Sequence, residues 1–177
     1  MSIVTGTGDE GETRLLFNRR IPKDDPRIEV LGTIDELCAT LGLALALGVS
    51  PSLQNQLLQI QNSLVHLMGA LAVHPQDRKI ASDLAFPNAL SEEIAALEQW
   101  IHRLEQEAKP FLRSWKRASR RPGAAALDLA RTVCRRGERR IVSLRRQDPG
   151  LSSLFQIYLN RLSDFLWLAA VQEEASS

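Results

Sequence analysis

Hydrophobic residues recur every three or four positions in five stretches of the chain, and this spacing places them on one face of an α-helix. The alternation of apolar and polar residues that marks a half-buried strand is almost absent. Five amphipathic helices without strands predict an all-α helical bundle. In chain order the stretches run from about Ile28 to Gly48, from Pro51 to Leu71, from Ser91 to Pro110, from Pro122 to about Arg146, and from Leu154 to about position 172.

Local signals indicate where some of these helices begin. Ser91 is a favourable N-cap, and the two glutamates that follow it suit the positive end of the helix dipole. The sequence Asp-Pro-Gly at 148–150 predicts a turn before the last helix.

The first 27 residues contain too few apolar side chains to belong to the core. Glycines let backbone N–H groups approach a ligand closely, threonine hydroxyls donate hydrogen bonds, and cations attract phosphate. Residues of these kinds are Gly6, Gly8, Gly11, Thr5, Thr7, Thr13, Arg19, Arg20, Lys23 and Arg27. This composition fits an extended segment that wraps a polyphosphate, and it fits a flexible tail equally well.

The fourth helical stretch is strongly basic. One ridge of the helix consists of Arg131, Arg135 and Arg139, and a second consists of Arg136 and Arg140. Because like charges four residues apart repel each other on a helix, these arginines need partners. Acidic groups on neighbouring helices, a phosphate ligand and water are the candidates. A solvated basic face partnered by Glu138 is the alternative that involves no ligand.

A polar patch interrupts the apolar pattern of the fifth stretch. Asn160, Ser163 and Asp164 share one face of the helix because they are spaced at i, i+3 and i+4. Buried polar groups cost free energy unless they are paired. The patch therefore pairs with the basic helix or lines a ligand pocket, and both can hold.

The length of 177 residues favours a single domain over 1–177, with a phosphate-binding segment at 1–27 and a helical bundle at 28–172. The net charge of +1 gives no signal for binding to nucleic acid or a membrane. Cys38 and Cys134 lack the spacing of a metal site or a disulfide framework, so no metal site is assigned. No apolar run resembles a signal peptide or a membrane span, and we expect a cytoplasmic protein.

Four short segments, in this order along the chain, resemble the PduO-type ATP:cob(I)alamin adenosyltransferases. They are TGTGDEGET (Thr5–Thr13), RRIPKDDPRIEVLGTIDEL (Arg19–Leu37), ARTVCRRGERR (Ala130–Arg140) and NRLSD (Asn160–Asp164). The resemblance covers nearly the whole chain. Its middle, from about Ser50 to Lys109, matches only as amphipathic helix.

The resemblance implies a homotrimer of five-helix subunits that binds ATP between neighbouring subunits. The substrates would be ATP with Mg²⁺ and cob(I)alamin or a related corrinoid. Co(I) would attack the 5′ carbon of ATP, which releases triphosphate and leaves adenosylcobalamin. A corrinoid reductase and an adenosylcobalamin-dependent enzyme would be protein partners. No proton is abstracted in this reaction, which agrees with the lack of a convincing His or Cys constellation in the sequence.

The resemblance also implies roles for single residues. Three residues would be catalytic: Arg135 would contact ATP and support catalysis, and Asp35 would pair with Arg131 across the subunit boundary. Trp115, in the loop before the fourth helix, would stand in for a family phenylalanine that fills the lower axial face of the corrinoid. The nucleotide would be held by Thr5, Thr7, Gly8, Asp9, Gly11, Thr13, Arg20 and Lys23 together with Glu138, Arg139 and Asn160.

The chain departs from the family pattern at four places. Gly6 replaces a phosphate-binding cation, Cys38 an asparagine and Asp128 a histidine, and the loop around Trp115 is basic where the family has a Pro-Gly-Gly turn. Three functions therefore stay open: an active adenosyltransferase, a non-catalytic ATP- or corrinoid-binding sensor or delivery protein, and a structural trimeric bundle whose basic loop binds an acidic partner. The retained site residues favour the first.

Overall fold

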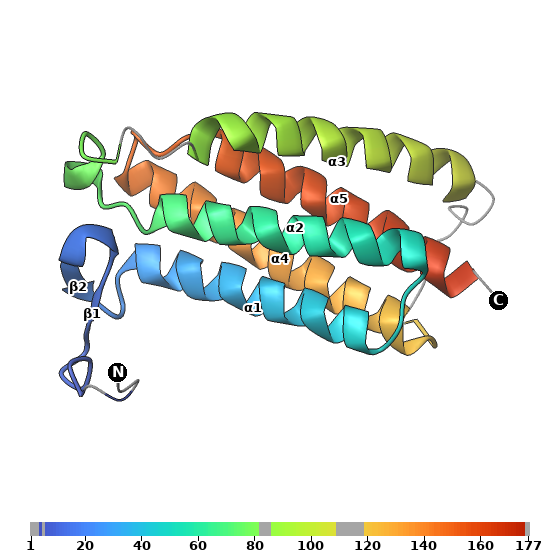
Figure 1. Cartoon of the computed structure of the whole chain (residues 1–177), viewed down its shortest axis with the longest axis horizontal. Coiled ribbons are helices and arrows are strands. Elements are labelled where there is room, and N and C mark those ends of the chain that lie inside the picture. The colour runs from blue at the N-terminus through green and yellow to red at the C-terminus, as the bar shows by residue number, and fades with distance from the viewer. Residues whose placement is uncertain (1–3, 5, 82–85, 109–118, 176–177) are drawn as a thin grey trace.

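The structure is a computed structural model that describes residue 4 and the ranges 6–81, 86–108 and 119–175, with no side chains described for 86–89 and 108. All five periodic stretches form helices, as the sequence predicted (Figure 1). The helices are α1 (Pro26–Ala46), α2 (Pro51–Leu71), α3 (Phe86–Ala108), α4 (Pro122–Gln147) and α5 (Leu154–Ala175). The shorter elements are strands β1 (Glu12–Arg14) and β2 (Arg20–Pro22) and the 3₁₀ turns η1 (Leu16–Asn18) and η2 (Pro75–Asp77).

Helix α3 begins at Phe86, five residues and thus more than one turn before the N-cap that the sequence suggested at Ser91. Pro87 stands in this extra turn. Proline is tolerated there because the first N–H groups of a helix have no intrahelical acceptor, so its missing N–H costs nothing. Helix α1 similarly begins at Pro26 rather than Ile28, where Asp25 caps it by accepting a hydrogen bond from the Arg27 N–H at 2.7 Å.

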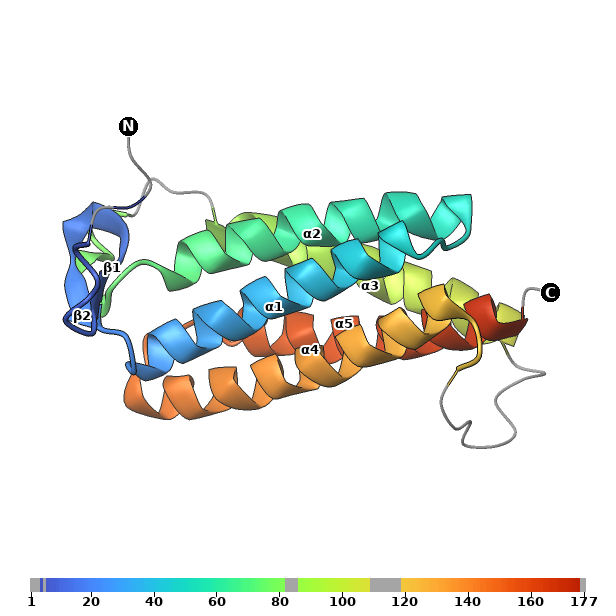
Figure 2. The ribbon, with the colours of Figure 1, turned by 90° about the horizontal axis from the view of Figure 1, so that it is seen from below.

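The helices bury one continuous apolar core. Helix α1 packs on α4 and on α2, α4 packs on α5, and α5 packs on α3. Figures 1 and 2 show the long axes of these helices roughly aligned, as in a helical bundle. Tyr158 and Phe165 of α5 and Ile34 of α1 are among the largest fully buried side chains. No helix in the described ranges is both long and apolar enough to cross a lipid bilayer.

The N-terminal segment is folded rather than extended. Strands β1 and β2 pair in antiparallel register, with Thr13 opposite Ile21. Phe17 and Asn18 in the connection adopt left-handed backbone angles, with φ of 56° and 59°. Leu15 and Ile21 of this segment are buried. We call residues 6–23 the N-terminal hairpin; it lies at the end of the bundle where α1 begins (Figures 1 and 2).

Candidate functional site

A basic pocket of about 320 Å³ lies in the N-terminal hairpin. It is lined by Thr7, Gly8, Glu12, Thr13, Arg14, Arg20 and Lys23. We call it the hairpin pocket. Its three cations outnumber its one carboxylate, so it attracts anions.

Most of the predicted phosphate-binding residues meet in the hairpin pocket. Thr7, Gly8, Thr13, Arg20 and Lys23 line it, whereas Glu12 and Arg14 were not among the predicted residues. Pairing of β1 with β2 brings this set together, and it could not be foreseen from strands only three residues long.

The other predicted hairpin residues lie outside this lining. Asp9 is exposed. Gly11 turns the chain with φ of 83°, a left-handed angle that favours glycine, and its carbonyl accepts a hydrogen bond from the Lys23 N–H at 2.8 Å. Thr5 lies outside the described residues.

Two details of the hairpin pocket suit close approach of an anion. A Cβ atom on Gly8 would lie 3.1 Å from the Lys23 Nζ atom, so a side chain there would press on the ammonium group. Arg20 is held by an exposed ion pair with Glu12 at 3.0 Å. An exposed pair of this kind is worth little, so a polyphosphate can replace the carboxylate at small cost.

A second pocket, of about 380 Å³, lies between α4 and α5. Arg131, Arg135, Ser163, Asp164 and Trp167 line it, and we call it the α4–α5 pocket. The structure thus joins the two arginines predicted as catalytic to part of the predicted polar patch. Trp167 was not among the predicted site residues, because it belongs to a largely apolar helix. Its spacing from Ser163 and Asp164 does place it on the same face of that helix.

The arginines of α4 divide into two groups. Arg131 pairs with Asp128 at 2.7 Å, Arg136 pairs with Glu36, and Arg140 pairs with Glu29 and the Thr33 hydroxyl. Arg135 and Arg139 are exposed, and within the described part of the chain their side chains make no hydrogen bond or ion pair. The neighbouring helix α1 therefore pairs with the second ridge, whereas Arg135 and Arg139 of the first ridge have no partner in the described part of the chain.

Asn160 and Glu138 are bound to each other. The Asn160 amide donates to Glu138 Oε1 at 3.2 Å, and its carbonyl oxygen accepts from Arg161 at 2.9 Å. Arg161 in turn bonds Glu98 of α3 at 3.0 Å. This network joins α3, α4 and α5, so both predicted site residues are held in place by protein contacts.

Asp35 and Arg131 of the same chain do not pair with each other. Asp35 is exposed on α1 and makes no ion pair among the described residues, and Arg131 is occupied by Asp128. Their pairing across a subunit boundary stays a prediction. Trp115 lies outside the described residues, so its predicted contact with the corrinoid also stays a prediction.

Neither cysteine is suited to nucleophilic chemistry. Burial raises the pKa of the Cys134 thiol far above its ordinary value, and the nearby Glu138 carboxylate raises it further. The protonated thiol donates to the Leu159 carbonyl at 3.2 Å. Partial burial, and then the charge of Asp35, raise the pKa of Cys38. Among the described residues, no three His, Cys, Asp or Glu side chains lie together as a metal site would require.

The two pockets share no residue. Arg135 lies twelve residues before the end of α4, which is about 18 Å along the helix at a rise of about 1.5 Å per residue. The hairpin lies beyond that end of the bundle (Figure 2). The two pockets are therefore separate features of the chain.

The fold and the site thus define a five-helix bundle with two arginine-containing pockets, whose positive charge suits anionic ligands. The model of the cobalamin adenosyltransferase family matches residues 3–173. The chain therefore belongs to the cobalamin adenosyltransferase family.

Relatives from several bacteria support this assignment. The chain is 37% identical to the corrinoid adenosyltransferase PduO of Citrobacter freundii, over 98% of this chain and 50% of the relative. It is 36% identical to PduO of Salmonella typhimurium, over 100% of this chain and 51% of the relative. The chain thus spans about half the length of these two relatives. It is 37% identical to the corrinoid adenosyltransferase of Bacillus subtilis, over 96% of this chain and 85% of the relative.

Solved structures share the fold. A variant of the PduO-type ATP:corrinoid adenosyltransferase from Lactobacillus reuteri, complexed with cobalamin and ATP, matches with a TM-score of 0.81 and 31% identity, over 98% of this chain and 93% of that chain. A second variant of the same protein, complexed with ATP, matches with a TM-score of 0.81 and 30% identity, over 98% and 94% of the two chains.

Proposed function

We propose that this protein transfers the 5′-deoxyadenosyl group of ATP to the Co(I) ion of a corrinoid, which gives adenosylcobalamin and triphosphate. Co(I) donates an electron pair to the 5′ carbon, and the bond from that carbon to the triphosphate oxygen breaks. The electrons leave with triphosphate, so no proton is removed from carbon and no general base is required. Family membership and the two basic pockets support this reaction.

The observation that carries the proposal is Arg135. It lines the α4–α5 pocket beside Trp167 and Asp164, and it has no protein partner within the described part of the chain. A cation kept free in a pocket with an aromatic wall is suited to an anionic nucleotide. Arg135 stabilises the negative charge that develops on the leaving triphosphate.

The hairpin pocket holds the triphosphate. Arg20 and Lys23 neutralise its charge, Thr7 and Thr13 donate hydroxyl hydrogen bonds, and Gly8 lets the backbone come close. Mg²⁺ enters with the nucleotide and shares this neutralisation. Arg139 adds a second free cation on α4, and Glu138 holds Asn160 beside the nucleotide ribose.

The proposal includes a homotrimer. Because the two pockets lie apart in one subunit, the hairpin of one subunit closes on the α4–α5 pocket of the next. Asp35 then pairs with Arg131 across that boundary, in competition with Asp128. The reaction takes place in the cytoplasm, with a corrinoid reductase that supplies Co(I) and an adenosylcobalamin-dependent enzyme that receives the product.

The test is an anaerobic assay with ATP and chemically reduced cobalamin that follows loss of the Co(I) absorbance band. Loss of the band with formation of adenosylcobalamin supports the transferase. ATP binding without loss of the band indicates instead the sensor or delivery protein. Absence of binding to ATP and to cobalamin would leave only the structural bundle.

A further inference from the structure

Arg19, just before β2, and Arg20, the first residue of β2, make different contacts. Arg20 lines the hairpin pocket, whereas Arg19 does not. Arg19 instead binds Asp77 with two hydrogen bonds, from Nη2 to Oδ1 at 2.6 Å and from Nε to Oδ2 at 3.0 Å. This bidentate geometry fixes the direction of the guanidinium plane. The hairpin therefore presents one arginine to a ligand and uses the other as an attachment to the bundle.

Asp77 is a firm anchor for that attachment. Only 5% of its surface is exposed, and it ends the 3₁₀ turn η2 that follows α2. The hydrogen bonds from Arg19 hold the pKa of the Asp77 carboxyl below its ordinary value, against the opposing effect of burial. The carboxylate is therefore ionised at neutral pH. A backbone hydrogen bond of 3.1 Å from the Leu16 N–H to the Ala72 carbonyl ties the hairpin to the same region.

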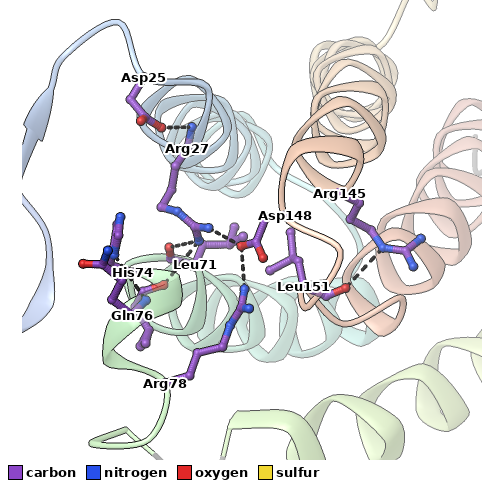
Figure 3. Close-up of polar contacts among 10 residues, drawn as sticks. Asp25, Arg27, Leu71, His74, Gln76, Arg78, Arg145, Asp148 and Leu151 are labelled. Carbon is purple, nitrogen blue, oxygen red and sulfur yellow. Dashed lines mark hydrogen bonds and ion pairs between the residues drawn. The ribbon is translucent and has the colours of Figure 1, made fainter.

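The residue after Asp77 connects this anchor to the core of the bundle end. Arg78 donates to Asp148 at 2.5 Å, and Asp148 also accepts from Arg27 at 2.5 Å. Arg27 further donates to the Leu71 carbonyl at 2.8 Å. Figure 3 shows the side chains of Arg27 and Arg78 both reaching Asp148. The η2 turn is thus held by α1 and by the α4–α5 turn, so Asp77 cannot shift freely.

We propose that Asp77 is a positioning residue for nucleotide binding, because it holds Arg19 and thereby orients the hairpin that carries Arg20 and Lys23. This inference rests on the proposed function, in which the hairpin pocket binds the triphosphate of ATP. Preorganisation raises affinity because the ligand need not order the binding segment itself. Without the Arg19–Asp77 pair, ATP must order the hairpin as it binds. The chemistry on already bound ATP does not depend on the pair.

The rival reading makes Arg19 a direct phosphate ligand, like Arg20. Asp77 would then compete with ATP for the Arg19 guanidinium, and removal of the carboxylate would tighten ATP binding. The two readings therefore predict opposite signs for the same substitution.

The experiment measures ATP affinity by calorimetry without corrinoid, and kcat and KM for ATP in the anaerobic assay. The variants are Asp77→Asn, Arg19→Gln and the double variant. We expect each single variant to weaken ATP binding and raise KM roughly tenfold, with kcat at saturating ATP within about twofold of wild type. The double variant should be no weaker than either single variant, because both remove one shared interaction.

The double variant also controls for misfolding. It removes both charges, so no buried charge is left unpaired. Glu107→Gln is the matched control: it removes one negative charge on exposed α3 and keeps the hydrogen bond from Gln172. It should leave ATP affinity unchanged. Unchanged or tighter ATP binding in Asp77→Asn, or additive losses in the double variant, would overturn the positioning role. Failure of the wild-type protein to bind ATP would instead overturn the proposed function.

Discussion

Arg27, at the hairpin end of the bundle, and Arg135 and Arg139, on α4, have opposite surroundings. At the bundle end, Arg27 is 4% exposed and gives its hydrogen bonds to Asp148 and to two backbone carbonyls. On α4, Arg135 and Arg139 are exposed and have no partner in the described part of the chain. An arginine side chain is thus structural in one region and available to a ligand in the other. Whether carboxylates and carbonyls of the protein bind its guanidinium group determines which of these roles it has.

The largest effect on stability should come from the buried cluster. Asp148→Ala leaves Arg27 buried without its carboxylate, and breaking such a pair costs about 3–5 kcal/mol of unfolding free energy. Urea denaturation at neutral pH measures this loss. Asp24 is exposed, and its side chain makes no hydrogen bond or ion pair among the described residues. The unfolding free energy of Asp24→Ala should therefore stay within about 0.5 kcal/mol of the wild-type value. Equal effects of the two substitutions would contradict the structural role of the cluster.

Acid should remove the same stabilisation. Burial raises the pKa of Asp148, but hydrogen bonds from Arg78 and Arg27 and their positive charges outweigh it and leave that pKa below its ordinary value. A carboxyl whose pKa is lower in the folded state stabilises the fold above its unfolded pKa, about 3.9, and this contribution is lost as pH falls through the folded pKa. The stability difference between wild type and Asp148→Asn should therefore shrink below about pH 4.

Arg135→Ala should affect chemistry instead of folding. Loss of one cation that stabilises transition-state charge typically lowers kcat by about 10²–10³-fold. An exposed arginine without a protein partner contributes little to stability, so the melting temperature should hardly change. Arg146→Ala, also exposed on α4, is the control and should keep full activity. The assignment fails if Arg135→Ala turns over normally or melts far below wild type.

Asp35 tests whether the free arginines face a neighbouring subunit. Asp35→Arg puts like charges together at the proposed boundary, and we expect assembly or ATP binding to weaken by roughly tenfold or more. Asp35→Asn removes the attraction without adding repulsion and should have a smaller effect. Sedimentation and calorimetry measure the two quantities. The proposed site between subunits would be contradicted if the wild-type protein binds ATP as a monomer. It would also be contradicted if the Asp35→Arg variant keeps its assembly and its ATP affinity.

The sequence predicted the helices because long stretches with apolar residues every three or four positions are an unambiguous signal of an amphipathic helix. It did not predict the hairpin, because three residues such as Glu12–Arg14 are too few to show an alternating pattern. The Arg27–Asp148 contact joins residues 121 positions apart, and only the packed bundle reveals it. In the α4–α5 pocket, helical spacing predicted that Arg131 and Arg135 share one ridge of α4 and that Asp164 belongs to a polar patch on α5. Which α4 arginines pair with α1 depends on packing, and the spacing contained no information about it.

The smallest effect should come from the α4 arginines that do have partners. Arg136 pairs with Glu36 of α1, with side chains that are 37% and 53% exposed. Water and salt screen such a pair, so Arg136→Ala should cost only about 0.2–1 kcal/mol of unfolding free energy. Activity should remain near wild type because Arg136 does not line the α4–α5 pocket. Thermal melting at low and high salt measures the pair, and the small loss should diminish at high salt. A loss of activity as large as that of Arg135→Ala would show that both ridges of α4 face the ligand, and the division between paired and free arginines would then fail.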